Sequence, residues 1–417
     1  MKAEIISVGT ELLVGQITNT NAKYLARRLN DFGVDVYYQT TVGDNLTRLV
    51  DVLKAASDRV DFIVLTGGLG PTEDDLTREA LSHFTGRPLV RDQTAEARIR
   101  AFFERLNQPM TENNLRQAER PDGSYPLPND IGLAIGWVLE LSSTKLVMAL
   151  PGPPRELQTM FERYGRAYIQ ERLPQVSPLI SRYLHFAGIG ESQLATRLAP
   201  LIQKQTDPTI ALYASVGEVT VRLSTRAARE REAQVKLQPV MDAVIASAPE
   251  FYYGEGESLT LAQVLIERLT RRQETLALIE SCTGGLIADT LIAVPGASAV
   301  VRLGVIPYQT LMKAKVLGID AEKLSEQGAV SAWTAERMAE SGRSLAVADW
   351  ALATTCVAGP TMQDGQPVGR AYIGLAHNDA VFASEHTVSG DRQTIRERVM
   401  RLALFHLWRT MLQKSND

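Results

Sequence analysis

The sequence predicts an α/β protein of three domains: an N-terminal three-layer domain, a small middle α/β domain and a C-terminal α/β domain. Its 417 residues exceed one ordinary core, since domains average about 150 residues. Short apolar runs alternate with amphipathic stretches, which is typical of βαβ units around a largely parallel sheet. Glycine-rich turns follow apolar runs near both ends of the chain, and such turns predict a small-molecule site in each end domain.

The first domain is expected over residues 1–170. Its apolar runs predict strands at residues 3–8, 34–40, 61–65 and 146–150. Amphipathic periodicity predicts helices at residues 21–32 and 46–56, with further helices after the turns at 66–71 and 151–156. Gly33 is expected to close the first of these helices, and Asp44 or Asn45 to open the second. The polar stretch 105–130 is expected to connect these elements.

The middle domain is expected over residues 175–253 and the last over 255–417. The middle pattern is shorter: a strand at 181–186, a helix at 192–202, two strands within 210–223 and another helix. It suits a spacer, a dimerisation domain or a lid. Gly254 and Gly256 predict a hinge, because two nearby glycines leave the backbone unconstrained. The last domain is expected to begin with a helix at 259–269, a strand at 276–279 and a helix at 285–293.

Composition excludes several classes of protein. The net charge of −4 offers no basic field for a phosphate backbone, so direct nucleic-acid binding is not expected. No apolar run approaches the roughly 18 residues of a membrane span, and residues 1–6 lack the regions of a signal peptide. A cytoplasmic location is therefore expected. Cys282 and Cys356 have no metal-ligand spacing, so neither a disulfide framework nor a zinc site is predicted.

The most specific segment is Glu280-Ser281-Cys282-Thr283-Gly284-Gly285, between a predicted strand and a predicted helix. Such a turn points free N–H groups at a ligand, and glycines let the ligand approach the backbone. This geometry suits an anion or a developing oxyanion, and Ser281 and Thr283 supply hydroxyl groups. In the alternative interpretation, one of these hydroxyls only caps the helix.

A nucleophilic serine needs a base, and the five histidines show no suitable arrangement. Lys313 is the candidate, because a desolvated lysine can replace histidine as the base. It follows Tyr308 where a predicted strand passes into a helix. The alternative is an ordinary solvated lysine.

The last domain resembles the CinA C-terminal domain. The resemblance rests on the order and spacing of segments 280–285, 295–298, 308–313, 328–331, 358–360 and 367–369. That domain is similar to amidohydrolases that convert nicotinamide mononucleotide to nicotinate mononucleotide and ammonia. The resemblance implies that Ser281 is the nucleophile, Lys313 the general base and Tyr308 an assistant in proton transfer. It assigns the remaining positions to oxyanion or substrate contacts (Thr283, Gly284, Gly285), the pocket wall (Thr355) and the phosphate (Arg392).

This scheme requires no metal or other cofactor at the C-terminal site. Cys282 is a rival nucleophile, but the family pattern favours its neighbour, and a small buried thiol is expected instead. Two replacements support an alternative: Cys356 stands where the family has glycine, and residues 309–312 replace Ser/Thr-Asn-Glu-Ala. Under that alternative the site is weakened or inactive, and the protein acts as a competence or DNA-damage adaptor beside a recombination protein.

A second group of motifs lies at the predicted carboxyl ends of strands in the first domain, where open α/β sheets bind ligands. The turns suited to cradling a phosphate contain Gly9, Thr10, Gly67, Gly68, Gly70 and Gly152. The acids that could hold a hard divalent ion are Glu11, Asp44, Asp74 and Asp75. Helix capping by Asp44 and Asp74 is the alternative.

These N-terminal motifs resemble the molybdopterin-binding-like domain of CinA proteins. The resemblance implies hydrolysis of ADP-ribose with a divalent metal of the Mg, Mn or Co type. It places Asp44 and Asp75 on the paired acidic positions of that fold, and Asn129 in the segment that contacts the second half of the substrate. A pterin-handling enzyme is an alternative that rests on fold alone. The preferred hypothesis is a pyridine-nucleotide salvage hydrolase with two sites, which forms a homodimer and binds small nucleotides.

Overall fold

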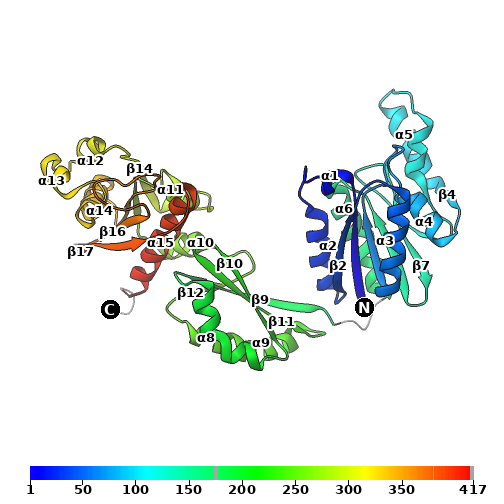
Figure 1. The fold of residues 1–417 in the computed structure, drawn as a ribbon, viewed down its shortest axis with the longest axis horizontal. Coiled ribbons are helices and arrows are strands. Elements are labelled where there is room, and N and C mark those ends of the chain that lie inside the picture. The colour runs from blue at the N-terminus through cyan, green and yellow to red at the C-terminus, as the bar shows by residue number, and fades with distance from the viewer. Residues whose placement is uncertain (173–176, 379, 414–417) are drawn as a thin grey trace. The chain divides into compact units, whose positions relative to one another are not determined.

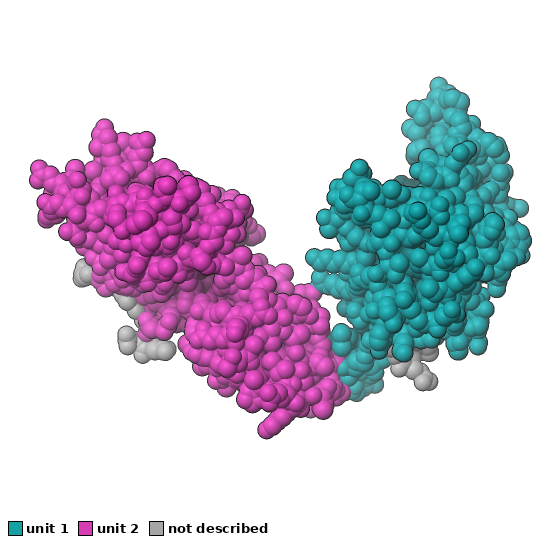
Figure 2. All heavy atoms as spheres, viewed as in Figure 1, with its two compact units in different colours: residues 1–180, 226–233 teal, residues 181–225, 234–417 magenta. Residues whose placement is uncertain are grey.

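The computed structural model describes residues 1–172, 177–378 and 380–413. Contacts within the chain divide it into two compact units, residues 1–180 with 226–233 and residues 181–225 with 234–417 (Figure 2). Both units combine sheets with helices (Figure 1), so the predicted α/β class is confirmed. Among the described residues, no helix combines the length and apolar character needed to cross a membrane.

The first unit is built on a sheet of order β2-β1-β3-β8-β7-β6. The strands β1 (Lys2–Val8), β2 (Asp35–Val42), β3 (Phe62–Thr66) and β8 (Lys145–Leu150) are parallel. The strands β6 (Tyr125–Leu127) and β7 (Gly136–Ser142) add antiparallel pairs at one edge. The parallel pairing brings the carboxyl ends of β1, β3 and β8 to one edge of the sheet.

Helices cover both faces of this sheet (Figure 1). One core contains Ile5 of β1 with residues of α2 (Thr20–Asp31) and α6 (Pro154–Met160). The other contains Ile6 of the same strand with residues of α3 (Leu46–Arg59) and α4 (Thr77–Thr85). Successive strand residues point to opposite faces, so a strand buried on both sides is mostly apolar along its whole length. This is the predicted three-layer arrangement. The unit also contains α1 (Thr10–Leu13), the π-helical turn η2 (Phe161–Gly165) and α7 (Arg166–Arg172).

The region between α4 and β8 differs from the prediction. The polar stretch contains the 3-10 helix η1 (Glu112–Ala118), and β4 (Leu89–Arg91) pairs with β5 (Glu119–Pro121) beside α5 (Gln93–Arg105). The strand β7 was not predicted, although its Trp137 is fully buried. It pairs antiparallel with β8, so the alternation of strand and helix expected from βαβ units does not reveal it.

The middle segment forms a sheet of order β10-β11-β9-β12. Its elements follow the order β9 (Leu179–Ala187), α8 (Glu191–Lys204), β10 (Thr209–Ser215), β11 (Glu218–Arg226), α9 (Glu230–Ser247) and β12 (Tyr252–Glu255), which is the ferredoxin-like pattern. The backbone at the predicted hinge, residues 254–256, is not unconstrained as expected. Gly254 lies within β12, and the Gly256 N–H donates to the carbonyl of Tyr183 at 3.0 Å, so this backbone is held in the sheet.

The C-terminal part of the second unit contains a sheet of order β14-β13-β15-β16-β17. Two parallel pairs join β14 (Val301–Val305), β13 (Leu276–Glu280) and β15 (Trp350–Cys356), whereas β16 (Arg370–His377) and β17 (Ala380–Thr387) are antiparallel. One face packs on α10 (Leu261–Arg272), α11 (Leu286–Ile292) and α15 (Arg392–Gln413), beside the 3-10 turn η3 (Ala297–Ala299). The other face packs on α12 (Thr310–Leu317), α13 (Ala321–Gln327) and α14 (Ala332–Ala346).

Candidate functional sites

The structure brings Ser281 and Lys313 together in the C-terminal domain. Ser281 is the first residue after β13, and Lys313 lies on α12 with 2% of its surface exposed. The Lys313 Nζ donates to Ser281 Oγ at 3.1 Å and to the carbonyl oxygen of Pro307 at 3.1 Å. Burial lowers the pKa of Lys313 to about 8, against an opposing effect of the Asp364 carboxylate. An appreciable fraction of this amine is therefore neutral near physiological pH, as a base for a serine hydroxyl must be.

The turn that carries Ser281 is held by a buried carboxylate. Glu280 is 1% exposed and accepts hydrogen bonds from the N–H groups of Gly285, Ile287 and Ala288 at 2.9, 3.2 and 2.8 Å. A negative charge also suits the positive end of the helix dipole. On the other side of the turn, Arg396 of α15 donates to the carbonyl oxygens of Cys282 and Thr283. These contacts fix the position of the serine.

The same contacts correct the predicted roles of Thr283, Gly284 and Gly285. The Gly285 N–H is bonded to Glu280, and the Gly284 N–H donates to the carbonyl of Ser281 at 3.2 Å. Thr283 is fully buried, and its hydroxyl shares a hydrogen bond of 2.8 Å with Thr354. These donors build the turn and are not available to an oxyanion in this structure. The sequence could not show this, because it does not reveal which acceptor lies behind the turn.

A pocket of about 450 Å³ opens beside the serine. The predicted residues that line it are Ser281, Tyr308, Lys313, Thr355 and Arg392. The Arg392 guanidinium donates to the Tyr308 hydroxyl at 2.7 Å and to the carbonyl of Gly359 at 2.6 Å. The hydroxyl of Thr355 donates to the carbonyl of Ala329 at 2.7 Å, so its predicted place in the pocket wall has a structural basis. Tyr308 thereby contacts the arginine, and its role in proton transfer stays a prediction.

The two cysteines correct another prediction. Cys282 and Cys356 form a disulfide with a Cα–Cα distance of 5.6 Å, although they are 74 residues apart in the sequence. Cys282 follows the end of β13 and Cys356 ends β15, and these parallel strands are neighbours. The spacing in the chain carries no sign of this pairing. Cys282 is therefore neither a free buried thiol nor a free rival to Ser281 in this structure.

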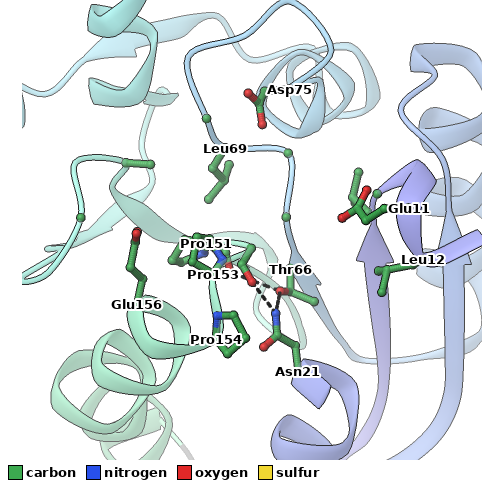
Figure 3. Close-up of a pocket in the computed structure, with 18 of the residues that line it drawn as sticks. Glu11, Leu12, Asn21, Thr66, Leu69, Asp75, Pro151, Pro153, Pro154 and Glu156 are labelled. Carbon is green, nitrogen blue, oxygen red and sulfur yellow. Dashed lines mark hydrogen bonds between the residues drawn. The ribbon is translucent and has the colours of Figure 1, made fainter. Parts of the chain in front are cut away.

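In the first unit, a pocket of about 730 Å³ lies at the carboxyl ends of β1, β3 and β8 (Figure 3). The predicted residues that line it are Gly9, Glu11, Asp44, Gly67, Gly68, Gly70, Asp74, Asp75 and Gly152. Two glycines are required by the backbone. Gly67 and Gly68 have φ of 98° and 67°, and a Cβ on either would lie 2.3 Å from a neighbouring oxygen. The tight turn after β3 thus exposes its backbone to the pocket.

Two acids of this pocket are each held by a nearby threonine. The Asp44 carboxylate accepts from the backbone N–H and the hydroxyl of Thr10 at 2.9 and 2.8 Å. Asp75 accepts in the same way from Thr72. Asn45, and not Asp44, caps α3. Asp44 instead accepts from the N–H of Thr10, which is the first residue of α1. Thr10 therefore serves the predicted site by holding an acid.

The predicted metal ligands fit one kind of metal site. Within residues 1–172, 177–378 and 380–413, no three or more His, Cys, Asp or Glu side chains come close enough to hold an ion by themselves. Glu11, Asp44, Asp74 and Asp75 nevertheless line one pocket. Magnesium is commonly held by one or two carboxylates together with substrate phosphates. These carboxylates therefore fit an ion that is bound partly by the protein and partly by a diphosphate. They do not fit an ion that is held by protein side chains alone.

Among the residues that line this pocket but were missing from the predicted site are Asn21 and Glu156. Asn21 donates to the carbonyl of Gly152 at 2.7 Å and to the hydroxyl of Thr66 at 3.1 Å (Figure 3). Glu156 of α6 accepts from Asn129 at 2.7 Å. Asn129 itself is 1% exposed and does not line the pocket, but it is hydrogen-bonded to three residues that do, Glu156, Gly132 and Ala134. Its position in the turn 151–156 could have predicted from the sequence that Glu156 lies at this pocket.

Three family models match the chain. They describe a molybdopterin binding domain over residues 4–171, a damage-inducible protein CinA KH domain over 181–254 and a CinA C-terminal domain over 258–411. Two Streptococcus pneumoniae proteins, from different strains and each named "putative competence-damage inducible protein", are 44% and 43% identical to this chain, and each alignment covers 99% of both chains.

Solved structures also match part of the chain. A CinA protein of unknown function from Thermoplasma acidophilum is 32% identical, with a TM-score of 0.37, over 40% of this chain and 96% of its own. A competence-damaged protein (CinA) superfamily member from Escherichia coli is 29% identical, with a TM-score of 0.35, over 36% of this chain and 88% of its own.

Proposed function

This chain belongs to the CinA family of competence- and damage-inducible proteins, and we propose that its C-terminal site hydrolyses nicotinamide mononucleotide to nicotinate mononucleotide and ammonia. One observation carries the proposal: a buried lysine with a pKa of about 8 contacts a serine hydroxyl at 3.1 Å. The serine lies at a strand-to-helix turn beside a pocket. This is the pairing of nucleophile and base that serine-lysine hydrolases use.

In the proposed reaction, neutral Lys313 takes the proton of Ser281 as Oγ attacks the carboxamide carbon. The protonated lysine then gives that proton to the departing nitrogen, and ammonia leaves as the tetrahedral intermediate collapses to an ester. A water molecule attacks this ester, with Lys313 again accepting the proton. The ester bond to Oγ breaks, the hydroxyl of Ser281 is restored, and nicotinate mononucleotide is released.

The substrate phosphate would bind at Arg392. A guanidinium can hold a phosphate through two parallel hydrogen bonds, and Arg392 lines the same pocket as Ser281. Its present contacts with Tyr308 and Gly359 orient it there. The pocket volume of about 450 Å³ lies within the usual range of small-molecule sites.

The direct test is ammonia release from nicotinamide mononucleotide by the purified protein. Ser281→Ala removes the nucleophile and should lower the rate by about a thousandfold or more, as loss of a nucleophile does in other hydrolases. Lys315→Ala, an exposed position on the same helix, is the matched control and should keep the rate. Full activity in the Ser281→Ala protein would refute the mechanism.

For the N-terminal pocket we propose hydrolysis of ADP-ribose with a divalent metal of the Mg, Mn or Co type. Support comes from the glycine turns and from the four carboxylates that line one pocket. Asp44 and Asp75 would hold the ion, with Asp74 and Glu11 as further ligands. A bound divalent ion would neutralise the diphosphate and lower the pKa of an attacking water. The residues of the turns would orient the substrate phosphates through backbone N–H groups.

This second activity is tested by incubating the protein with ADP-ribose and each metal in turn. AMP and ribose 5-phosphate should appear, and Asp75→Asn should abolish them. Asp58→Asn alters an exposed acid on α3 away from the pocket and should have no effect. Equal product formation by the two variants would remove Asp75 from the site.

A second candidate function is an adaptor in competence or DNA damage, which the names of the relatives favour. Under this proposal the protein, as a homodimer, contacts a recombination protein, and the C-terminal site is weak. Retention of a purified recombinase on the immobilised protein, together with no ammonia release, would support it. Ammonia release without retention would support the hydrolase.

A further inference from the structure

We propose that Cys282 and Cys356 form a thiol–disulfide exchange site, at which a small dithiol or disulfide controls the geometry of the pocket beside Ser281. This inference rests on the proposed function in one of its tests, which measures the rate of deamidation. It concerns the only two cysteines of the chain, one of which directly follows the nucleophile in sequence.

The bond joins two of the segments that line the pocket. Cys282 is adjacent to Ser281, and Cys356 is adjacent to Thr355, whose hydroxyl donates to the carbonyl of Ala329, another residue of the pocket lining. The Ser281 N–H also donates to the carbonyl of Thr354 at 3.0 Å. The disulfide therefore links the end of β13, which positions Ser281, to the end of β15, which carries Thr355 of the pocket wall.

A small reagent can reach this bond through the pocket. Cys282 and Cys356 are 5% and 7% exposed, and both line the pocket that also contains Ser281 and Lys313. Both cysteines also pack in an apolar cluster that includes Ile395 and Val399 of α15, neither of which lines the pocket. The pocket is thus the route by which a thiolate approaches a sulfur.

The exchange is balanced in electrons and protons. A thiolate of the dithiol attacks one cysteine sulfur, the Cys282–Cys356 bond breaks, and the other sulfur leaves as a thiolate that takes a proton. The second thiol of the reagent then attacks the mixed disulfide and closes its own disulfide. The two cysteines gain two electrons and two protons, and the reagent loses them. A small disulfide reverses the reaction.

Reduction should move the serine. Bonded sulfurs lie about 2.05 Å apart, whereas heavy atoms that only touch need about 3.5–4.0 Å. Packed interiors do not absorb such a change without displacement. Ile395 and Val399 pack with both cysteines, whereas Ser281 and Thr355 border the pocket, so we expect the displacement to fall on the turn of Ser281 or on the pocket wall. A misplacement of about 1 Å at a catalytic group can cost a hundredfold in rate.

The experiment compares the full-length protein after treatment with oxidised or reduced dithiothreitol. Alkylation and peptide mass spectrometry should find a Cys282–Cys356 cross-linked peptide after oxidation and two alkylated thiols after reduction. The deamidation rate should fall about tenfold or more on reduction, in line with the cost of misplacement. Cys356→Ala cannot form the bond, so its rate, whatever its level, should not respond to the reagent.

Each outcome decides the proposal. Two free thiols after oxidation, or wild-type rates that agree within about twofold in both states, would overturn it. If the protein releases no ammonia in either state, the proposed function has failed, and amide hydrogen exchange of residues 281–285 then decides the inference. Faster exchange in the reduced wild-type protein, absent from Cys356→Ala, would support it, and unchanged exchange would overturn it.

Discussion

Both pockets lie at the carboxyl ends of parallel strands, but their polar groups are organised differently. At the C-terminal pocket Lys313 and Ser281 are already in contact at 3.1 Å. At the N-terminal pocket the carboxylates of Asp44 and Asp75 are each held by a nearby threonine. No three acids or other metal-ligating side chains converge there in the part of the chain that the structure describes.

This difference separates two ways of building a site at the carboxyl edge of a sheet. The C-terminal domain brings the proposed nucleophile and base together through its own packing, because burying Lys313 both orients the amine and lowers its pKa. The N-terminal domain offers separate acidic groups around a glycine-lined cavity. Under the proposed functions, substrate and metal complete the second site, whereas the first needs only substrate.

The largest expected effect comes from removing the buried base. Lys313→Met keeps the length and apolar character of the side chain and should lower deamidation by about a thousandfold. Hydrolysis of ADP-ribose should stay unchanged, because Lys313 does not line the N-terminal pocket. Both rates are measured on the same preparation. A parallel loss of both activities would instead indicate misfolding, and circular dichroism checks for that.

Removing the metal should affect the other activity: ADP-ribose hydrolysis should fall and deamidation should remain. Treatment with a chelator is expected to reduce ADP-ribose hydrolysis by at least about a hundredfold, since a bound ion supplies several kcal/mol of charge stabilisation. Deamidation should be retained because its proposed steps use Ser281 and Lys313 alone. Restoring activity with Mg, Mn or Co tests the metal class. Deamidation that also needs metal would break the distinction between the two pockets.

The pH dependence should distinguish the pockets further. In the proposed mechanism deprotonated Lys313 is the active form, and its pKa is lowered to about 8 by burial. Below that pH the neutral fraction increases about tenfold per unit, so kcat/KM for deamidation should rise at that rate and level off above pH 8. Profiles are recorded from pH 6 to about pH 9.5. A flat profile across this range would exclude Lys313 as the base.

The smallest expected effect concerns stability. Glu280→Gln weakens the bonds that the buried carboxylate accepts from three N–H groups, and should lower the free energy of unfolding by about 1 kcal/mol. Asp44→Asn alters a half-buried acid and should cost less. Glu326→Gln changes an exposed acid on α13 and serves as the control. Thermal unfolding of all three proteins provides the measurement.

Local patterns in the sequence determined much of the fold. Apolar runs predicted β1, β3, β8 and β13, and the strand-turn-helix segment 280–285 indicated where a reactive serine would lie. These features depend on neighbouring residues, because the periodicity of burial and the backbone freedom of glycine are local properties. The strand β7 was missed, since its antiparallel pairing with β8 breaks the expected alternation.

Only the tertiary structure decided which distant groups meet. It placed Lys313 against Ser281, joined Cys282 to Cys356 across 74 residues, and turned the N–H of Gly285 toward Glu280 instead of the pocket. It also placed the four N-terminal acids around one cavity, where no three of the described side chains come close enough to hold an ion together. Sequence spacing cannot supply these results, because contacts between separate elements depend on strand order and on side-chain packing. The sequence therefore determined the elements and the candidate groups, and the fold decided which of those groups lie within bonding distance.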